Sequence, residues 1–252
     1  MKKYLISIED SHSPRLKSLF EQTTFLNKEK EFKVFGIKGR ELSVSEYFKQ
    51  GVAGKVKAMT PGELGCTLSH LQALHDFLAS NEAYAIIFED DVIEKNKIDF
   101  DDLEQKINQL NLKENFFLSL GGIQMKICNK VRGQLLEKSL FDQKVLQVDL
   151  DFLDKLSYAY AYVVDRKMAQ ALIDYHTPAR IYDHWKELST QKNVHFYATC
   201  LFEHPILTQD NISTHSHLEQ ERALSQHTSK SKTPVSQYFK KKLKKLMLHQ
   251  WS

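Results

Sequence analysis

The sequence predicts an α/β fold in which strands and helices alternate around a mainly parallel central sheet. Two observations support this prediction. Short apolar runs recur between segments with helical periodicity, and these runs are continuous rather than alternating with polar residues, which is typical of strands buried on both faces. The chain has 252 residues, of which 42% are hydrophobic, so it is long enough to bury such a core.

The expected strands are spread along the body of the chain. They comprise residues 4–8, 32–37, 83–88, 116–120, 158–164 and 194–201. After the first of them, a turn at 11–14 leads into a helix from about Arg15 that buries one apolar side. Ligands of parallel sheets bind at the carboxyl ends of the strands, so the residues that follow each run are candidates for a site.

Two helices have clear start signals. In the first, Thr60 is the expected N-cap, Pro61 takes the first helical position and Glu63 closes a capping box. The second helix covers about 166–175, with Asp165 as its expected N-cap. The first helix should be packed on much of its circumference, because it carries a stripe of leucines. These are Leu64, Leu68, Leu71, Leu74 and Leu78.

Three consecutive acids, Glu89, Asp90 and Asp91, follow the strand run in YAIIFEDDV. Neighbouring carboxylates raise each other's pKa, so the triplet is unfavourable unless a cation neutralises it, and Mg²⁺ or Mn²⁺ suits hard carboxylate oxygens. Residues i and i+2 of an extended segment point the same way, so Glu89 and Asp91 would face one ion while Asp90 faces elsewhere. A solvated turn is the alternative interpretation, and the triplet alone does not decide between them.

Cysteine usage and hydropathy limit the class of protein. Cys66, Cys128 and Cys200 are an odd number, lie far apart and form no CxxC pair, so neither a disulfide framework nor a structural zinc site is indicated, and a reducing cytoplasm fits best. The N-terminal apolar stretch ends at Glu9, which is too short for a signal peptide. No window approaches the roughly 20 apolar residues of a membrane span.

The C-terminal end is strongly basic. Residues 222–252 contribute eight positive charges and no acid, and since the whole chain carries +3, residues 1–221 carry −5. We therefore expect a globular domain at 1–222 and a separate tail at 223–252. On a helix, apolar side chains of the tail fall near one side, which is typical of an amphipathic helix on an anionic membrane surface. These are Phe239, Leu243, Leu246 and Trp251, with Tyr238 and Met247 flanking them.

Two other interpretations of the tail are a disordered solvated segment and a nucleic-acid patch. The apolar side argues against a purely solvated run. No nucleic-acid motif accompanies the charge, so no nucleic-acid partner is expected.

A family resemblance sharpens these expectations. PGELGCTLSH at 61–70, followed by AIIFEDDV at 85–92, closely resembles the signature of glycosyltransferase family 25, the lipooligosaccharide-biosynthesis glycosyltransferases. The similarity continues through YLISIEDSHSPRLKSL, AYAYVVDRKMAQALI, YDHW and HPILTQDNIS, and so spans roughly 4–215.

The resemblance implies a GT-A-like, Rossmann-type nucleotide-sugar-binding fold and an inverting hexose transfer. The implied donor is usually UDP-galactose, with UDP-glucose as the alternative, and the acceptor is a sugar of the lipooligosaccharide or lipopolysaccharide core. It also implies a divalent metal, Mn²⁺ or Mg²⁺, held by a variant of the Asp-x-Asp motif. A peripheral position on the cytoplasmic face of the inner membrane suits such a lipid-linked acceptor.

Metal ligation is assigned through this resemblance. Asp91 is the first candidate ligand and Glu89 the second, while Asp90 is expected to touch the ribose or the donor sugar. His215 or His217, in STHSH, would supply a further ligand. A histidine in a polar segment is often simply exposed, which is the alternative for both.

Donor contacts are expected from two segments. At the end of the first strand, the resemblance implies Ile6, Ser7 and Arg15, although the family's turn is usually richer in arginine and only Arg15 remains here. On the capped helix it implies the residues Glu63, Ser69 and His70. The capping box alone explains Glu63, and a hydrogen-bonded core histidine is an ordinary alternative for His70.

For the general base we choose Asp183 in YDHW, next to Trp185, whose face would stack on an acceptor sugar. The alternative is Asp183 as the N-cap of a helix in HWKEL. Cys66 is most simply a small packing residue.

Two other classes of function compete with a glycosyltransferase. Phosphoryl-transfer proteins such as receiver domains also place acids after a buried strand, but they need an aspartate nucleophile near the first strand, which here ends in Ser7, Ile8 and Glu9. A non-catalytic, membrane-bound sugar-binding protein on the same fold is the third possibility.

Overall fold

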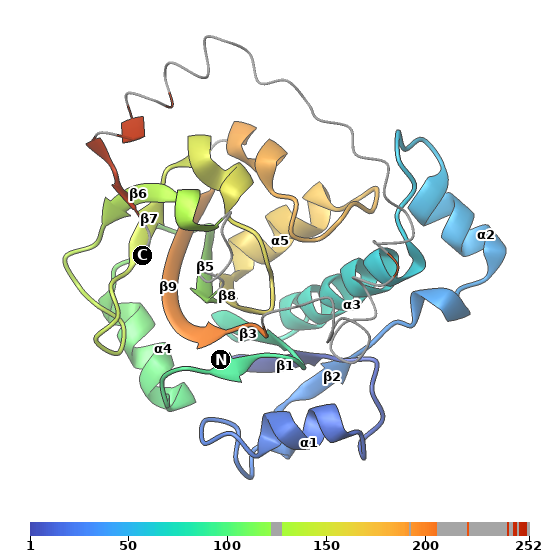
Figure 1. Cartoon of the computed structure of the whole chain (residues 1–252), viewed down its shortest axis with the longest axis horizontal. Coiled ribbons are helices and arrows are strands. Elements are labelled where there is room, and N and C mark those ends of the chain that lie inside the picture. Colours follow the sequence, from blue (N-terminus) through green and yellow to red (C-terminus); the bar gives the residue numbers. More distant parts are fainter. Residues whose placement is uncertain are drawn as a thin grey trace.

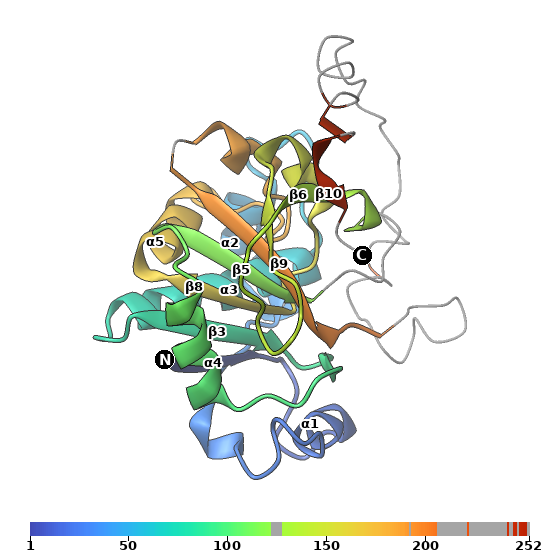
Figure 2. The same cartoon turned by 90° about the vertical axis from the view of Figure 1, so that its left-hand side faces the viewer.

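The computed structural model describes residues 1–121, 128–191, 193–205, 221, 241, 244–245 and 247–250. Its centre is a ten-stranded sheet, which Figures 1 and 2 show from two sides. The strands are β1 (Lys2–Ile6), β2 (Lys33–Phe35), β3 (Tyr84–Glu89), β4 (Ile93–Glu94), β5 (Phe116–Gly121), β6 (Arg132–Leu135), β7 (Leu146–Val148), β8 (Ala161–Asp165), β9 (His195–Glu203) and β10 (His249–Gln250). Their order is β10-β6-β7-β9-β5-β8-β3-β1-β2, and β4 pairs with β9.

The sheet is mixed, so the expected α/β class is confirmed but the mainly parallel sheet is wrong. Strand β1 runs parallel to β2 and β3, and β5 runs parallel to β9. Strand β8 lies antiparallel between β3 and β5, and the other pairs are antiparallel as well. Continuous apolar runs report burial on both faces of a sheet, which an enclosed antiparallel strand also has, so they do not determine strand direction.

Helices cover both faces of the sheet (Figure 1). Helices α3 (Pro61–Leu78) and α5 (Arg166–Tyr175) lie on one face, and α1 (Pro14–Phe20) and α4 (Phe100–Gln109) lie on the other. Shorter helical segments are η1 (Glu29–Glu31), η2 (Gly39–Glu41), α2 (Val44–Tyr47), η3 (Phe48–Val52), η4 (Cys128–Lys130), η5 (Leu150–Lys155) and η6 (Lys186–Thr190).

Alternation along β1 explains the two cores. Tyr4 and Ile6 belong to the apolar cluster on the α3 and α5 side, whereas Leu5 belongs to the cluster on the α1 and α4 side. Successive side chains of a strand point to opposite faces, so a strand covered on both sides must be apolar throughout.

The start of α3 is as the sequence predicts. The Thr60 side chain accepts a hydrogen bond from the backbone N–H of Glu63, and the Glu63 carboxylate accepts one from the N–H of Thr60 at 2.9 Å. Close backbone contact holds the preceding segment against this helix. A Cβ on Gly65 would lie 2.4 Å from the carbonyl oxygen of Ile37, and one on Gly39 would lie 1.7 Å from that of Pro61. Glycine at both positions therefore brings η2 and the end of β2 to the first turns of α3.

The described part of the C-terminal tail contacts the domain. Strand β10 pairs antiparallel with β6 at the edge of the sheet, so the expected amphipathic helix does not extend over His249–Gln250. The Lys244 ammonium lies 2.7 Å from both Asp149 and Asp151, and Lys241 lies 3.1 Å from Asp154. Of the residues expected on or beside the apolar side of the tail, all but Met247 lie outside the described residues, namely Tyr238, Phe239, Leu243, Leu246 and Trp251, and the boundary at 222 stays a prediction.

Within the described ranges, no helix combines the length and the apolar character needed to cross a bilayer. The three cysteines are free thiols.

Candidate functional site

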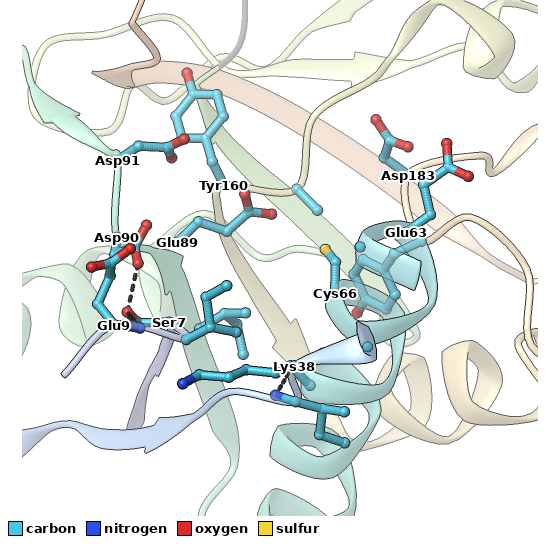
Figure 3. A pocket seen from close by; sticks show the side chains of 18 of the residues that line it. Ser7, Glu9, Lys38, Glu63, Cys66, Glu89, Asp90, Asp91, Tyr160 and Asp183 are labelled. Atoms are coloured by element: carbon cyan, nitrogen blue, oxygen red, sulfur yellow. Dashed lines mark hydrogen bonds between the residues drawn. The ribbon is translucent and has the colours of Figure 1, made fainter. Parts of the chain in front are cut away.

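A pocket of about 380 Å³ opens at the carboxyl ends of β1 and β3, beside the first turns of α3. Figure 3 shows it from close by. Its volume falls within the range of small-molecule sites. Because β1 and β3 are parallel, with Ile6 opposite Glu89, the residues that follow both strands meet at the same edge. The pocket is therefore where the sequence places it.

Ser7 and Asp90 join the two strand ends. The Ser7 hydroxyl donates to Asp90 at 2.5 Å, and the same oxygen accepts from the backbone N–H of Glu9 at 3.1 Å (Figure 3). Asp90 is 8% exposed and lines the pocket. Its second oxygen pairs with Arg15. Both carboxylate oxygens of Asp90 therefore already have a partner, and its expected contact with the donor would have to be made in addition to these.

Arg15 is the cation that neutralises two of the three acids. Its Nε lies 2.6 Å from Asp90, and its Nη2 lies 2.9 Å from Asp91. Helix α1 presents this side chain after the Ser13 N-cap and a proline at the first helical position. Burial raises the pKa of Asp90 to about 6, even though the Arg15 charge opposes that shift. For Arg15, burial lowers the pKa, but the neighbouring carboxylates outweigh it, so that the pKa is raised.

His204 is a second partner of Asp91, and sequence reasoning did not single it out. Its Nε2 lies 3.1 Å from Oδ2 of Asp91, and its ring lies against Tyr158 and Tyr160. Burial alone would raise the pKa of Asp91, but the hydrogen bond and charge of His204 outweigh burial and lower it. In turn, Asp91 raises the pKa of His204 against the effect of burial. In the sequence, the signal that could have identified His204 is its position directly after a buried strand run.

Glu89 has different surroundings. Its Oε1 lies 3.2 Å from Nε2 of His70, whose Nδ1 lies 3.0 Å from the Tyr162 hydroxyl. The His70 ring stacks on Tyr182 at 4.0 Å, and the hydroxyls of Tyr162 and Tyr182 are 2.7 Å apart. His70 is fully buried and does not line the pocket. The expected direct contact of His70 with the donor is therefore wrong, and the histidine instead positions Glu89.

The ligand atoms of Cys66, His70 and Glu89 lie within 4.8 Å of one another. Sulfur and imidazole ligands suit zinc-like metals rather than Mg²⁺ or Mn²⁺. Cys66 lines the pocket, which goes beyond the packing role expected for it. Figure 3 shows the Glu89 carboxylate turned toward the side of Cys66, whereas that of Asp91 lies beside Tyr160.

The pocket fits a hard divalent cation on two observations. First, Oδ1 of Asp91 is buried without a hydrogen-bond partner among the described residues. Second, eight carboxylate side chains line the pocket against the three permanent cations Arg15, Lys38 and Arg40. Asp91 and Glu89 offer the oxygen ligands that Mn²⁺ and Mg²⁺ prefer. The further candidates His215 and His217 lie outside the described residues.

Of the expected donor contacts, Ile6, Ser7, Arg15, Glu63 and Ser69 all line the pocket. Glu63 closes the capping box, as expected, and also lines the cavity, so its contact with the donor stays a prediction. The Ser69 hydroxyl accepts from the N–H of Ile37 and donates to the carbonyl of Gly65, each at 2.7 Å. Its hydroxyl group therefore fixes the wall of the pocket.

Asp183 lines the opposite wall of the pocket. Its Oδ2 accepts from the backbone N–H of Tyr158 at 3.1 Å. The alternative of a helix N-cap is wrong, because the helical turn η6 begins later and has Trp185 at its N-cap position. Trp185 is 1% exposed and packs 4.7 Å from Phe117, so the expected stacking on an acceptor sugar is also wrong. An isolated aromatic in a polar sequence does not reveal whether it faces a ligand or the core.

Comparison with known protein families gives one match. The model of glycosyltransferase family 25 (LPS biosynthesis protein) matches residues 1–185. The matched range includes the strand ends, the capped helix, the acid triplet and Asp183, and it stops before His204. A search of curated proteins found no match.

Proposed function

The chain belongs to glycosyltransferase family 25 and is a glycosyltransferase of lipopolysaccharide biosynthesis, and from this premise we propose its donor, cofactor and mechanism. The donor is a UDP-hexose, UDP-galactose in the first instance and UDP-glucose as the alternative. The acceptor is a sugar of the lipooligosaccharide or lipopolysaccharide core. The hexose is transferred with inversion, and Mn²⁺ or Mg²⁺ is required.

The excess of carboxylates in the pocket is the observation that supports this proposal. A diphosphate is itself anionic, so a pocket lined by eight acids would repel it without added positive charge. Asp91 Oδ1 and Glu89 would hold the metal, which when bound acts as a Lewis acid on the departing diphosphate. Arg15 and His204 hold Asp91 in place from the side opposite to its unpartnered oxygen.

Asp183 is the proposed general base. In an inverting transfer, the acceptor hydroxyl attacks the anomeric carbon from the face opposite the diphosphate, and one carboxylate must accept its proton. Asp183 and Glu63 lie on the wall away from the acid triplet; Glu63 is engaged in the capping box with Thr60, whereas the hydrogen bond from Tyr158 orients Asp183. The acid triplet and Asp183 thus divide the work between leaving group and nucleophile.

The proposed location is the cytoplasmic face of the inner membrane, with the basic tail as one contact to anionic lipid. The absence of a spanning helix among the described residues is consistent with a peripheral protein.

The test is a transfer assay with a panel of UDP-sugars and a truncated lipooligosaccharide acceptor, with and without Mn²⁺. We expect metal-dependent transfer of one hexose and loss of transfer in Asp183→Asn, while the protection of the protein by UDP and Mn²⁺ in a thermal melt is retained. UDP protection without transfer of any sugar would instead support a non-catalytic sugar-binding protein. Absence of both would remove the nucleotide-sugar proposal.

A further inference from the structure

Residues 43–58, which we call the lobe, expose three large apolar side chains beside the pocket. The lobe contains α2 and η3 and projects at the edge of the molecule (Figure 1). Val44 is 86% exposed, Phe48 is 58% exposed and Val56 is fully exposed. Val44 and Phe48 are four residues apart and therefore share one side of the helical segment.

The lobe is held to the domain by other residues. The Tyr47 hydroxyl donates to the carbonyl of Met59 at 2.5 Å, and Gly51 packs so closely that a Cβ there would lie 3.2 Å from Leu64. Tyr47 packs against the small apolar cluster that contains Met59 and Leu64. The three exposed side chains are not part of this cluster, so the fold does not require them to be apolar.

The charge of the lobe differs from that of the domain around it. It contains Lys49, Lys55 and Lys57 against the single acid Glu46, whose carboxylate is engaged in a capping box with Ser43. The lobe is thus +2, whereas the rest of residues 1–221 is −7. Lys49 and Lys57 are exposed and form no ion pair with an acid in the part of the chain that the structure describes.

The lobe also adjoins the mouth of the pocket. The segment immediately before it, Lys38 to Glu41, lines the pocket, and so does Glu63 on α3 just after it. A surface that docked on the lobe would therefore lie next to the part of the cavity that Lys38 to Glu41 and Glu63 line.

We propose that the lobe docks on an anionic phospholipid surface, inserting Val44, Phe48 and Val56 while its lysines contact the headgroups. Apolar side chains with interspersed lysines are the pattern that binds such interfaces. A second copy of the chain is a poorer occupant, because two lobes of +2 would face each other. The docking itself follows from the surface alone; that it delivers a lipid-linked acceptor to the pocket rests on the proposed function.

Two of the three described lysines of the tail, Lys241 and Lys244, contrast with Lys49 and Lys57 of the lobe. Lys241 and Lys244 are paired with Asp149, Asp151 and Asp154 on the domain. Before these two lysines contact lipid, they must leave their acids, whereas Lys49 and Lys57 need not. The lobe therefore provides a membrane contact that does not depend on release of the tail.

The proposal is tested on the full-length protein with vesicles of phosphatidylethanolamine and phosphatidylglycerol. We expect the triple variant V44S/F48S/V56S to lower the partition coefficient in a sedimentation assay by about tenfold or more, since it removes the inserted apolar groups. The matched control is L26S/V34S, which replaces two side chains of 50% and 49% exposure elsewhere and should bind as the wild type does. Binding of all three proteins should fall when phosphatidylcholine replaces phosphatidylglycerol.

A direct readout distinguishes insertion from a change in charge or fold. In Phe48→Trp, we expect a blue shift of the added fluorescence with anionic vesicles, and in Leu26→Trp no shift. Unchanged partitioning of the triple variant, or no shift for Phe48→Trp, would overturn the proposal. A lipid-free dimer that the triple variant dissociates, with unchanged vesicle binding, would assign the lobe to self-association instead. UDP protection in a thermal melt, measured on the same proteins, separates these results from any failure of the proposed function.

Discussion

The two ends of the acid triplet are stabilised by different means. Asp90 and Asp91 are compensated by charge, because Arg15 from α1 contacts both and His204 after β9 contacts Asp91. Glu89, only one residue away, instead meets a buried network of rings that carry no permanent charge, which starts at His70. Strand β3 ends at Glu89, and Asp90 and Asp91 lie in the turn that follows, so the alternation of the strand does not extend to Asp91 and the side chains meet different parts of the fold.

This difference indicates two kinds of constraint at one site. The contacts of Asp90 and Asp91 with Arg15 and His204, which we call the charged side, depend on residues distant in sequence. Breaking them leaves a buried carboxylate without a partner. The contact of Glu89 with the ring network at His70, which we call the neutral side, depends on packing and orientation. Breaking it leaves the fold in place but misaligns Glu89. The following predictions separate the two.

The largest effect is expected from Asp91→Asn. It removes the negative charge of the carboxylate whose unpartnered Oδ1 is proposed to hold the metal, so transfer should fall by about a thousandfold or more. The melting temperature should fall as well, because the substitution removes the carboxylate that pairs with His204 and Arg15, so rates are compared at a temperature where the variant is folded. Steady-state transfer rates with and without Mn²⁺ provide the measurement, with the exposed Asp101→Asn as the matched control. Full, metal-dependent activity in Asp91→Asn would refute the assignment of this side to the metal.

Removal of Arg15 tests the charged side as a structural element. In Arg15→Ala, the buried Asp90 loses its counter-ion, and we expect a loss of about 3 kcal/mol in the free energy of unfolding, the lower end for a broken buried pair because Arg15 is 26% exposed. Denaturant unfolding measures it. Lys17→Ala, on the same helix with its side chain 76% exposed, is the control and should be neutral. Equal stability of the two variants would show that the ion pairs do not support the fold.

Substitution of His70 tests the neutral side. His70→Phe keeps a ring against Tyr182 but removes the nitrogen next to Glu89, so activity should fall by about 10- to 100-fold, as for other groups that orient a ligand. The Mn²⁺ concentration for half-maximal activity should rise at the same time. The exposed His75→Phe on the same helix controls for surface changes. Lost stability with an unchanged metal requirement would make His70 a core residue only.

Local signals were sufficient for much of the fold. The capping box at Thr60 and Glu63 and the Asp165 cap depend on neighbours within one helical turn, and the structure has both. Strand direction was mispredicted, because apolar continuity is the same for parallel and antiparallel strands when both faces are covered.

The site was predictable only in part, because some of its contacts join residues that are distant in sequence. Glu89, Asp90 and Asp91 follow one strand, so their common position is a local property. Their partners are not local, since His204 lies more than a hundred residues away in sequence and meets Asp91 only because β4 pairs with β9. Similarly, nothing local to Trp185 shows that Phe117 and Phe196 bury it.

The smallest effect concerns the pH dependence of stability and His176, which lies beyond Tyr182 in the ring network. His176 stacks on Tyr182, and burial lowers its pKa to about 4 from an ordinary value of 6.5. The unfolded chain therefore binds the proton more readily, so this contribution to stability is present above about pH 6.5 and is lost as the pH falls toward 4. Protonation of Asp90 has the opposite effect on stability, because its raised pKa favours the folded state as the pH falls below about 6. Wild type and His176→Gln should thus differ in slope by about 1 kcal/mol per pH unit between pH 6.5 and 5, measured by denaturant unfolding. Parallel profiles would show that His176 is as easily protonated in the folded protein as in the unfolded chain, and that the neutral side does not exclude charge.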